Sequence, residues 1–215
     1  MSVYSPTKQL LFVHIPKSAG KTVRKKMGRT YEVKNNLTTD KNYHSTIDIC
    51  CQNIKDFDSY YKFTIVRNPW DRVCSWFYFR KDILYNSLYR KNDTKIRKFR
   101  GVSDKILLEE YNLMNNDFNE WLHLNIYKQW NNTWFALNHD QMTWINDVDM
   151  FDKICRFENL QTDLKQIPHF TNINFSEKNN LSSNDGNYTQ LFSSESRDLI
   201  ADIYKRDIET FNYEF

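Results

Sequence analysis

The sequence contains little glycine, proline or cysteine, with four of each among its 215 residues. Its four cysteines do not have the spacing of metal ligands, which excludes zinc modules, and we expect reduced thiols rather than a disulfide framework. No apolar run approaches the roughly 18 residues that a membrane span needs. The apolar run at residues 10–13 is too short for the core of a signal peptide. We therefore expect a cytoplasmic protein without a membrane partner.

A large charge surplus is missing as well. Thirty basic and 27 acidic residues leave a net charge of +3, which is too small to indicate a nucleic-acid-binding protein. Such a balance still suits a small anionic ligand held by a few cations. The hydrophobic fraction of 40% and the aromatic fraction of 16% are typical of a folded chain. The length predicts a single domain over residues 1–215.

Strand and helix patterns alternate along the chain. Short apolar or β-branched runs predict strands at residues 9–15, 62–66 and 151–157. Helical patterns occupy residues 21–28, 45–54, 69–89, 103–113, 118–126, 159–167 and 193–211. Ser45 is the candidate N-cap of the second of these helices. This order predicts an α/β fold in which helices flank a parallel sheet. Ligands of such sheets bind at the carboxyl ends of the strands.

The first strand leads into a turn with several hydrogen-bond donors. A strand, a tight turn and a helix follow one another between Phe12 and Thr22. Such a turn directs backbone N–H groups and the positive end of the helix at one point, which favours an anion. Lys17, Ser18 and Lys21 add side-chain donors, although surface lysines at the start of a helix are common.

The nucleotide-binding P-loop, GxxxxGK[ST], is one interpretation of this turn. Gly20, Lys21 and Thr22 match the end of that motif. Its first glycine is replaced by Ile15, however, and a proline follows. Because the loop needs a glycine where it wraps under the phosphates, a P-loop kinase or NTPase remains only an alternative.

A second informative segment covers residues 62–76. Arg67 ends a strand, and Asn68 and Pro69 are a typical N-cap and first residue of the helix that follows. Ser75 comes about two turns into that helix, so Arg67 and Ser75 are placed to face one phosphate. The alternative is a capped helix with a surface arginine. Another arginine of this segment, Arg72, is expected to pair with an acid such as Asp71 or Glu158.

Together these two segments resemble the sulfotransferases. Residues 14–20 are similar to their 5′-phosphosulfate loop, and residues 66–75 to their 3′-phosphate motif. The greatest similarity is to the Golgi-type carbohydrate sulfotransferases, which include the heparan 2-O and chondroitin enzymes, and it continues through residues 156–160 and 204–215. The resemblance implies an enzyme with a P-loop-like α/β fold, the donor 3′-phosphoadenosine 5′-phosphosulfate (PAPS) and no metal.

The resemblance also implies roles for individual residues. Lys17 would contact the bridging oxygen of the phosphosulfate and neutralise the leaving phosphate, while Arg67 and Ser75 would hold the 3′-phosphate. The 5′-phosphate would lie in the backbone cradle of residues 18–22, which are Ser18, Ala19, Gly20, Lys21 and Thr22. Lys21 departs from the family, which more often has threonine or serine there. Residues 180–187 lack the basic side chains that help to close over the donor in relatives.

The catalytic base is assigned to His44. An acceptor hydroxyl must lose its proton as the sulfuryl group arrives, and relatives place a histidine or glutamate base between the two motifs. His44 lies in this interval, with Asp40 and Asp48 as alternatives, whereas His14 is expected to be structural.

The acceptor is expected to be a hydroxyl of a saccharide or a small metabolite. The basic run at residues 91–100 would attract an anionic glycan, although such a run is more often a solvated loop. An aromatic cluster would stack on sugar rings, but its spacing suits core packing equally well; it comprises Trp121, Trp130, Trp134, Phe135 and Trp144. Gln141 and Trp144 are taken as structural. The competing hypothesis from another class is a donor-binding or glycan-binding protein without catalysis.

Overall fold

The computed structural model describes residues 2–35, 44–90, 103–127, 139–168, 170 and 187–215. The chain divides into two compact units. The first, here the sheet unit, comprises Met1–Asn68, Asp140–Asn180 and Glu209–Asn212. The second, the helical unit, comprises Pro69–His139, Leu181–Ile208 and Tyr213–Phe215. A single domain over residues 1–215 stays a prediction, and the expected basic loop and donor-closing segment lie outside the described residues.

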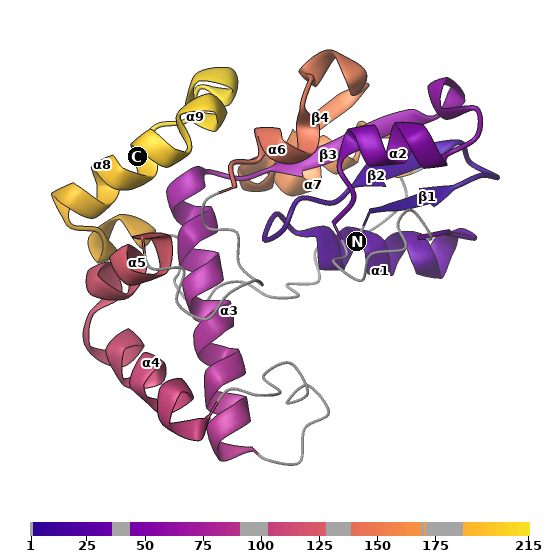
Figure 1. Ribbon diagram of the computed structural model, residues 1–215. Helices are drawn as coiled ribbons and strands as arrows, with labels where there is room; N and C mark the ends of the chain where they lie inside the picture. Colours follow the sequence, from indigo (N-terminus) through magenta and orange to yellow (C-terminus); the bar gives the residue numbers. More distant parts are fainter. Residues whose placement is uncertain (1, 36–43, 91–102, 128–138, 169, 171–186) are drawn as a thin grey trace. The chain divides into compact units, whose positions relative to one another are not determined.

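A four-stranded sheet forms the centre of the sheet unit (Figure 1). Its strands lie in the order β1 (Val3–Ser5), β2 (Leu10–Val13), β3 (Tyr61–Val66) and β4 (Lys153–Arg156). β2, β3 and β4 are parallel, as the α/β pattern predicts, whereas β1 runs antiparallel to β2. The sheet is therefore mixed rather than entirely parallel. β1 was not predicted, because a strand of only three residues is too short to produce a recognisable sequence pattern.

Helices α1 (Gly20–Thr30) and α7 (Leu160–Leu164) contribute to the main core of the sheet unit. Alternate side chains of the strands point to one face, where Phe12 and Phe63 stack at 5.0 Å between ring centroids. Val23 and Met27 of α1 and Leu164 of α7 pack with them. This packing places the start of α1 next to the end of β2.

Helix α2 (Ile47–Asn53) begins one residue later than the sequence pattern predicts. Its N-cap is Thr46, whose hydroxyl accepts a hydrogen bond from the Ile49 N–H at 3.4 Å. The predicted cap, Ser45, instead offers its carbonyl to the Ser2 hydroxyl at 2.9 Å. The short helix α6 (Met142–Ile145) and the 3₁₀ turns Phe57–Ser59, Val148–Met150 and Phe157–Asn159 complete the regular elements of the sheet unit.

The helical unit contains α3 (Pro69–Tyr89), α4 (Asp104–Asn116), α5 (Phe118–Tyr127) and α8 (Ser194–Ile203), with a 3₁₀ turn at Tyr188–Leu191. Its core is rich in aromatic side chains. Phe77 meets Phe118 and Trp121 edge to face, each at 5.0 Å between ring centroids. Trp121 is thus a core residue rather than a sugar platform, while Trp130, Trp134 and Phe135 lie outside the described residues.

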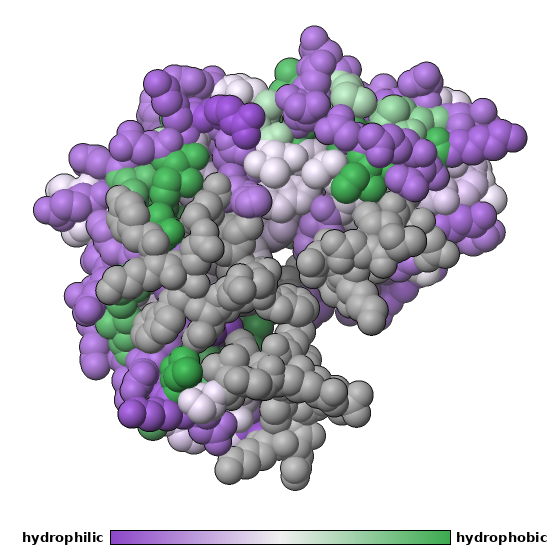
Figure 2. All heavy atoms as spheres, in the orientation of Figure 1, coloured by the Kyte–Doolittle hydropathy of each residue, from purple (hydrophilic) through white to green (hydrophobic). Residues whose placement is uncertain are grey.

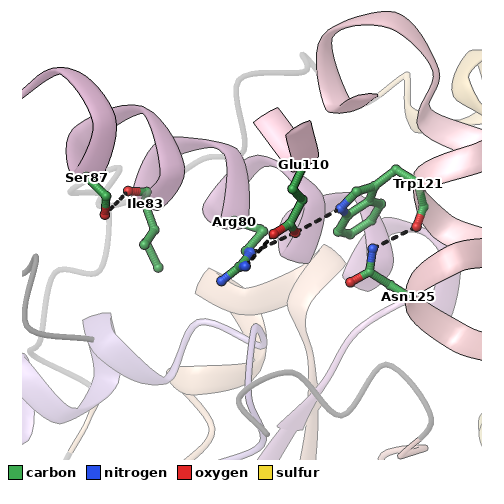
Figure 3. A network of polar contacts seen from close by, with 6 residues as sticks. All are labelled: Arg80, Ile83, Ser87, Glu110, Trp121 and Asn125. Atoms are coloured by element: carbon green, nitrogen blue, oxygen red, sulfur yellow. Dashed lines mark hydrogen bonds and ion pairs between the residues drawn. The ribbon is translucent and has the colours of Figure 1, made fainter. Parts of the chain in front are cut away.

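A buried ion pair joins the helices of this unit (Figure 3). Arg80 on α3 donates two hydrogen bonds to the Glu110 carboxylate on α4, at 2.9 Å from Nε and 2.5 Å from Nη2. Trp121 Nε1 donates to the same carboxylate at 3.3 Å. One carboxylate therefore connects three helices.

The last predicted helix, residues 193–211, is divided in two. α8 ends at Ile203 with Tyr204 as its C-cap, and α9 (Lys205–Phe211) follows. Tyr204 leaves the helical conformation, with φ −103° and ψ 24°, and its side chain is fully buried in the core. The apolar periodicity continues across this break, so the pattern predicted one helix instead of two. Ser193 caps α8, accepting from the Ser196 N–H at 3.2 Å.

Among the described residues, no helix combines the length and apolar character needed to cross a membrane. Hydrophilic residues cover much of the surface that Figure 2 shows, with smaller hydrophobic areas between them.

Candidate active site

The candidate site lies at the carboxyl ends of β2, β3 and β4. Val13 pairs with Thr64, and Val66 pairs with Arg156, so the three strands end at the same edge of the sheet. The residues that follow each strand therefore gather there. They are the turn at residues 14–19, then Arg67, then Phe157. This edge is where ligands of parallel sheets bind.

The turn after β2 has an unusual backbone. Lys17 and Ala19 both have positive φ angles, 70° and 55°. Non-glycine residues adopt this conformation rarely and at some energetic cost, and such residues are enriched at functional sites. The turn leads directly into α1. The Ser18 N–H donates to the Ile15 carbonyl at 3.3 Å and the Thr22 N–H to the Ala19 carbonyl at 2.9 Å, whereas N–H groups at the first positions of a helix, here Gly20 and Lys21, have no carbonyl partner one helical turn earlier. Its backbone is therefore suited to an anion, as the sequence pattern predicts.

Gly20, the first residue of α1, is required by the ring of His14. A Cβ atom at position 20 would lie 1.7 Å from His14 Cδ2, far inside contact distance. The imidazole therefore packs against the backbone of Gly20. Thr22 is also nearly buried, whereas Lys21 is exposed.

Arg67 is buried, with 3% of its surface exposed, so it is not the surface arginine of the alternative interpretation. Its Nη1 donates to the Lys17 carbonyl at 3.1 Å. Its guanidinium lies 3.9 Å from the centre of the Phe157 ring, a stacked cation–π contact. Arg67 thus connects the end of β3 to the strained turn and to the residue after β4.

Gln141 contacts both segments. Its Oε1 accepts from the Arg67 backbone N–H at 2.8 Å, and its Nε2 donates to the Arg67 carbonyl at 2.8 Å. The Ser18 hydroxyl also donates to Oε1, at 3.4 Å. A role for Gln141 in the site could not be anticipated from the sequence, because nothing in the pattern distinguishes it from any other polar residue before a strand.

His44 lies beside the turn. Its Nδ1 is 3.2 Å from the His14 carbonyl, and the two imidazole centroids are 4.6 Å apart. The carbonyl can only accept, so Nδ1 carries the proton, and in the neutral ring the lone pair is then on Nε2. The Trp144 indole donates to the His44 carbonyl at 3.2 Å and fixes the backbone.

The other candidates for the base are placed differently. Asp48 accepts from Asn146 Nδ2 at 3.3 Å, and Asp40 lies outside the described residues. Burial lowers the pKa of His14 well below the ordinary value of an imidazole, and the charges of His44, Arg24 and Lys17 lower it further. His14 is thus held in its neutral form at neutral pH.

Two residues of the second motif belong to the helical unit. Ser75 lies on α3 and is largely buried. Arg72 is fully buried, donates from Nη1 to the His139 carbonyl at 3.0 Å and lies 5.6 Å from the centre of the Tyr204 ring. Glu158 accepts from the Asn68 N–H at 2.7 Å. The pairing of Arg72 with Asp71 or Glu158 stays a prediction.

Two buried cysteines are unsuited to act as thiol nucleophiles, and no metal site appears in the described part of the chain. Burial raises the pKa of Cys50 and of Cys155 to about 12, so both remain protonated thiols. All four cysteines are free. No group of three metal-ligating side chains occurs among the residues that the structure describes.

Comparison with known proteins identifies the family of the chain. A family model described as the sulfotransferase family matches residues 1–214, which include both motifs and nearly the whole chain. No curated protein and no solved structure matches the sequence. The match over 1–214 covers the turn after β2, Arg67 and His44 alike. The chain therefore belongs to the sulfotransferase family and is an enzyme that transfers sulfuryl groups.

Proposed function

We propose that this sulfotransferase uses PAPS as its donor and a hydroxyl of a saccharide or small metabolite as its acceptor. One observation carries the proposal. The strained turn, Arg67 and His44, which are far apart in the sequence, are joined by hydrogen bonds at the carboxyl edge of the sheet. The turn supplies backbone N–H groups and an ammonium group, and Arg67 supplies a guanidinium. These donors fit a nucleotide with several anionic groups.

The turn is assigned the 5′-phosphate end of the donor. The backbone of residues 18–22 and the Thr22 hydroxyl would bind the 5′-phosphate, and Lys17 would neutralise it as it leaves. Arg67 and Ser75 are assigned the 3′-phosphate, and for Ser75 this assignment rests on its position in the sequence motif. Sulfuryl transfer depends mainly on positioning and charge stabilisation, as phosphoryl transfer does, so no metal is required of the site.

His44 is assigned the role of general base. When bound, the donor supplies a sulfuryl group whose bond to the 5′-phosphate breaks as the acceptor oxygen bonds to sulfur. His44 Nε2 would take the proton of the acceptor hydroxyl in this in-line displacement. Its Nδ1–H donates to the His14 carbonyl, which holds the ring in the tautomer that this role needs.

A pair of variants tests the base. We expect His44→Ala to abolish sulfuryl transfer while the dissociation constant of adenosine 3′,5′-bisphosphate stays within about threefold of the wild-type value. Asp48→Asn, which changes the alternative carboxylate, should keep most of the activity. Turnover that survives in His44→Ala and disappears in Asp48→Asn would transfer the role to Asp48.

Calorimetric titration tests the donor. Binding of adenosine 3′,5′-bisphosphate without magnesium supports the proposal, whereas magnesium-dependent binding of ATP alone would indicate a P-loop kinase or NTPase. Transfer of radiolabelled sulfate to a panel of glycans and small metabolites then identifies the acceptor. Binding without any transfer would indicate a protein that binds the donor or a glycan but does not catalyse.

We also propose that the protein works in the cytoplasm. The four free cysteines support a reducing compartment, because disulfides are common in oxidising ones. Cell fractionation tests this location, and recovery from an oxidising compartment would contradict it.

A further inference from the structure

Gln141 makes a pair of hydrogen bonds that a backbone strand would normally make. Its side chain is fully buried, and its amide bonds both the N–H and the carbonyl of Arg67, each at 2.8 Å. The last registered pair between β3 and β4 is Val66 with Arg156, so Arg67 lies just beyond the ladder. Buried backbone groups at such a point need partners, and the Gln141 amide supplies both.

The same side chain reaches the turn after β2. Its Oε1 also accepts from the Ser18 hydroxyl, at 3.4 Å, and Arg67 in turn donates to the Lys17 carbonyl. One neutral amide thus contacts each of the two segments assigned to the donor phosphates. Because an amide carries no charge, it can do this without repelling an anion, whereas a carboxylate of the same shape would repel it.

Hydrogen bonds of the neighbouring residues hold the backbone of Gln141 in place. The neighbouring Asp140 carboxylate accepts from the Thr143 N–H at 3.0 Å and from the Thr143 hydroxyl at 2.8 Å, which starts α6. The Gln141 carbonyl accepts from the Trp144 N–H at 3.0 Å. The amide is therefore presented from a closed turn rather than from an unsupported chain.

We propose that Gln141 is a positioning residue that sets Arg67 for the 3′-phosphate of the donor. This inference rests on the proposed function, since it takes Arg67 to bind that phosphate. Gln141 touches no reacting atom. It acts by fixing the backbone from which the Arg67 guanidinium extends. In this way it increases the contribution of the 3′-phosphate to the affinity for the donor.

The test compares two nucleotides on each variant. Adenosine 3′,5′-bisphosphate has both phosphates, whereas AMP has only the 5′-phosphate. The dissociation constant of AMP divided by that of the bisphosphate therefore measures the contribution of the 3′-phosphate to binding. A variant that is merely less stable weakens both nucleotides equally and leaves the ratio unchanged. We expect Gln141→Leu to lower the ratio at least tenfold and Arg67→Ala to lower it at least as much.

Gln166→Leu is the matched control. Gln166 is exposed, and its side-chain oxygen accepts from Lys153 Nζ at 2.7 Å, so the same chemical change there should keep the wild-type ratio. Gln141→Glu is the second variant, because it keeps the size and the Oε1 acceptor, loses the donor to the Arg67 carbonyl and adds a negative charge. It should lower the ratio in the same direction. Thermal unfolding establishes that each variant is folded at the temperature of the titration.

The outcomes separate the two proposals. A wild-type protein that binds both nucleotides equally overturns the proposed donor, and this inference with it. A wild-type preference for the bisphosphate that survives in folded Gln141→Leu and Gln141→Glu overturns only the role of Gln141. If both variants are unfolded during the titration, Gln141 is a folding residue and the positioning role is also overturned.

Discussion

The two units of this protein each bury a polar network, and the two networks are built differently. In the helical unit, Arg80 and Glu110 are two charged side chains that satisfy each other and hold α3 against α4 (Figure 3). In the sheet unit, Gln141 is a neutral side chain that bonds to backbone groups at the end of β3. The first network joins helices, and the second shapes the edge of a sheet.

This difference indicates how each network can be replaced. A buried ion pair can often be exchanged for well-packed apolar side chains, because its attraction mostly offsets the cost of removing two charges from water. Side-chain bonds to the backbone at a strand end cannot be exchanged in this way, since the backbone groups remain and still need partners. We therefore expect changes in the helical unit to alter stability and changes at the sheet edge to alter binding.

The largest effect on stability is expected for Glu110→Leu. Arg80 would then keep a buried charge without its carboxylate, which should lower the free energy of unfolding by about 3–5 kcal/mol. Urea unfolding measures this loss. The double variant Arg80→Met/Glu110→Leu removes both charges and should recover much of it. A loss below about 1 kcal/mol for the single variant would contradict the assignment of a strong buried pair.

Gly20→Ala is expected to affect both stability and binding. The new Cβ would overlap the His14 ring, so the imidazole must move, at a cost of about 1–3 kcal/mol, and nucleotide binding should weaken at least tenfold. Gly28→Ala, on the same helix, is the matched control. Its Cβ would lie 3.6 Å from Val33 Cγ2, an ordinary contact. This control should gain roughly 0.5–1 kcal/mol, as alanine does inside a helix. Equal behaviour of the two variants would show that the His14 contact does not constrain the turn.

The sheet unit should also lose stability in mild acid. The pKa of His14 is lowered in the folded protein, so between that value and about 6.5 the unfolded chain binds more protons than the folded one. The free energy of unfolding should therefore fall as the pH drops below about 6.5, by at most about 1.4 kcal/mol per pH unit for this one group. Denaturant unfolding between pH 7.5 and 5 measures the slope. His14→Gln should flatten it, and an unchanged slope would remove His14 as its cause.

The smallest effect is expected at the start of α2. Thr46→Ala removes the cap on the Ile49 N–H and should cost about 1 kcal/mol in denaturant unfolding. Ser45→Ala should cost less, because only the Ser45 carbonyl takes part in a hydrogen bond there. A larger loss of unfolding free energy in Ser45→Ala than in Thr46→Ala would show that Ser45 is the N-cap.

Local patterns predicted the elements that carry the site. The runs around Leu10–Val13 and Tyr61–Val66 led to β2 and β3, and the cap of Asn68 and Pro69 led to α3. These signals are strong because each depends on neighbouring residues only. β1 was not predicted, because three residues are too few to show the alternation of a strand. The break at Tyr204 was not predicted either, because the helical periodicity of apolar residues continues through it.

The residues of the site divide in the same way. Lys17, Gly20, Arg67 and His44 were proposed from the two motifs and from the resemblance to the family, both of which can be seen in the sequence. The contact of Gln141 with Arg67 and the stacking of Arg67 on Phe157 were not predicted, because each joins positions more than 70 residues apart. Nothing along the chain distinguishes one buried glutamine from another polar residue until the strands have been placed side by side.

By itself, then, the sequence determined the α/β class and the family and pointed to the turn proposed to bind phosphate, because these depend on short-range patterns and on the order of two motifs. The tertiary structure decided which groups hold that turn. It placed the His14 ring against Gly20, put the Arg67 guanidinium on the Lys17 carbonyl and set Gln141 against the end of β3. Such contacts arise only when parallel strands align their carboxyl ends, since buried backbone and charged groups must then find partners within reach.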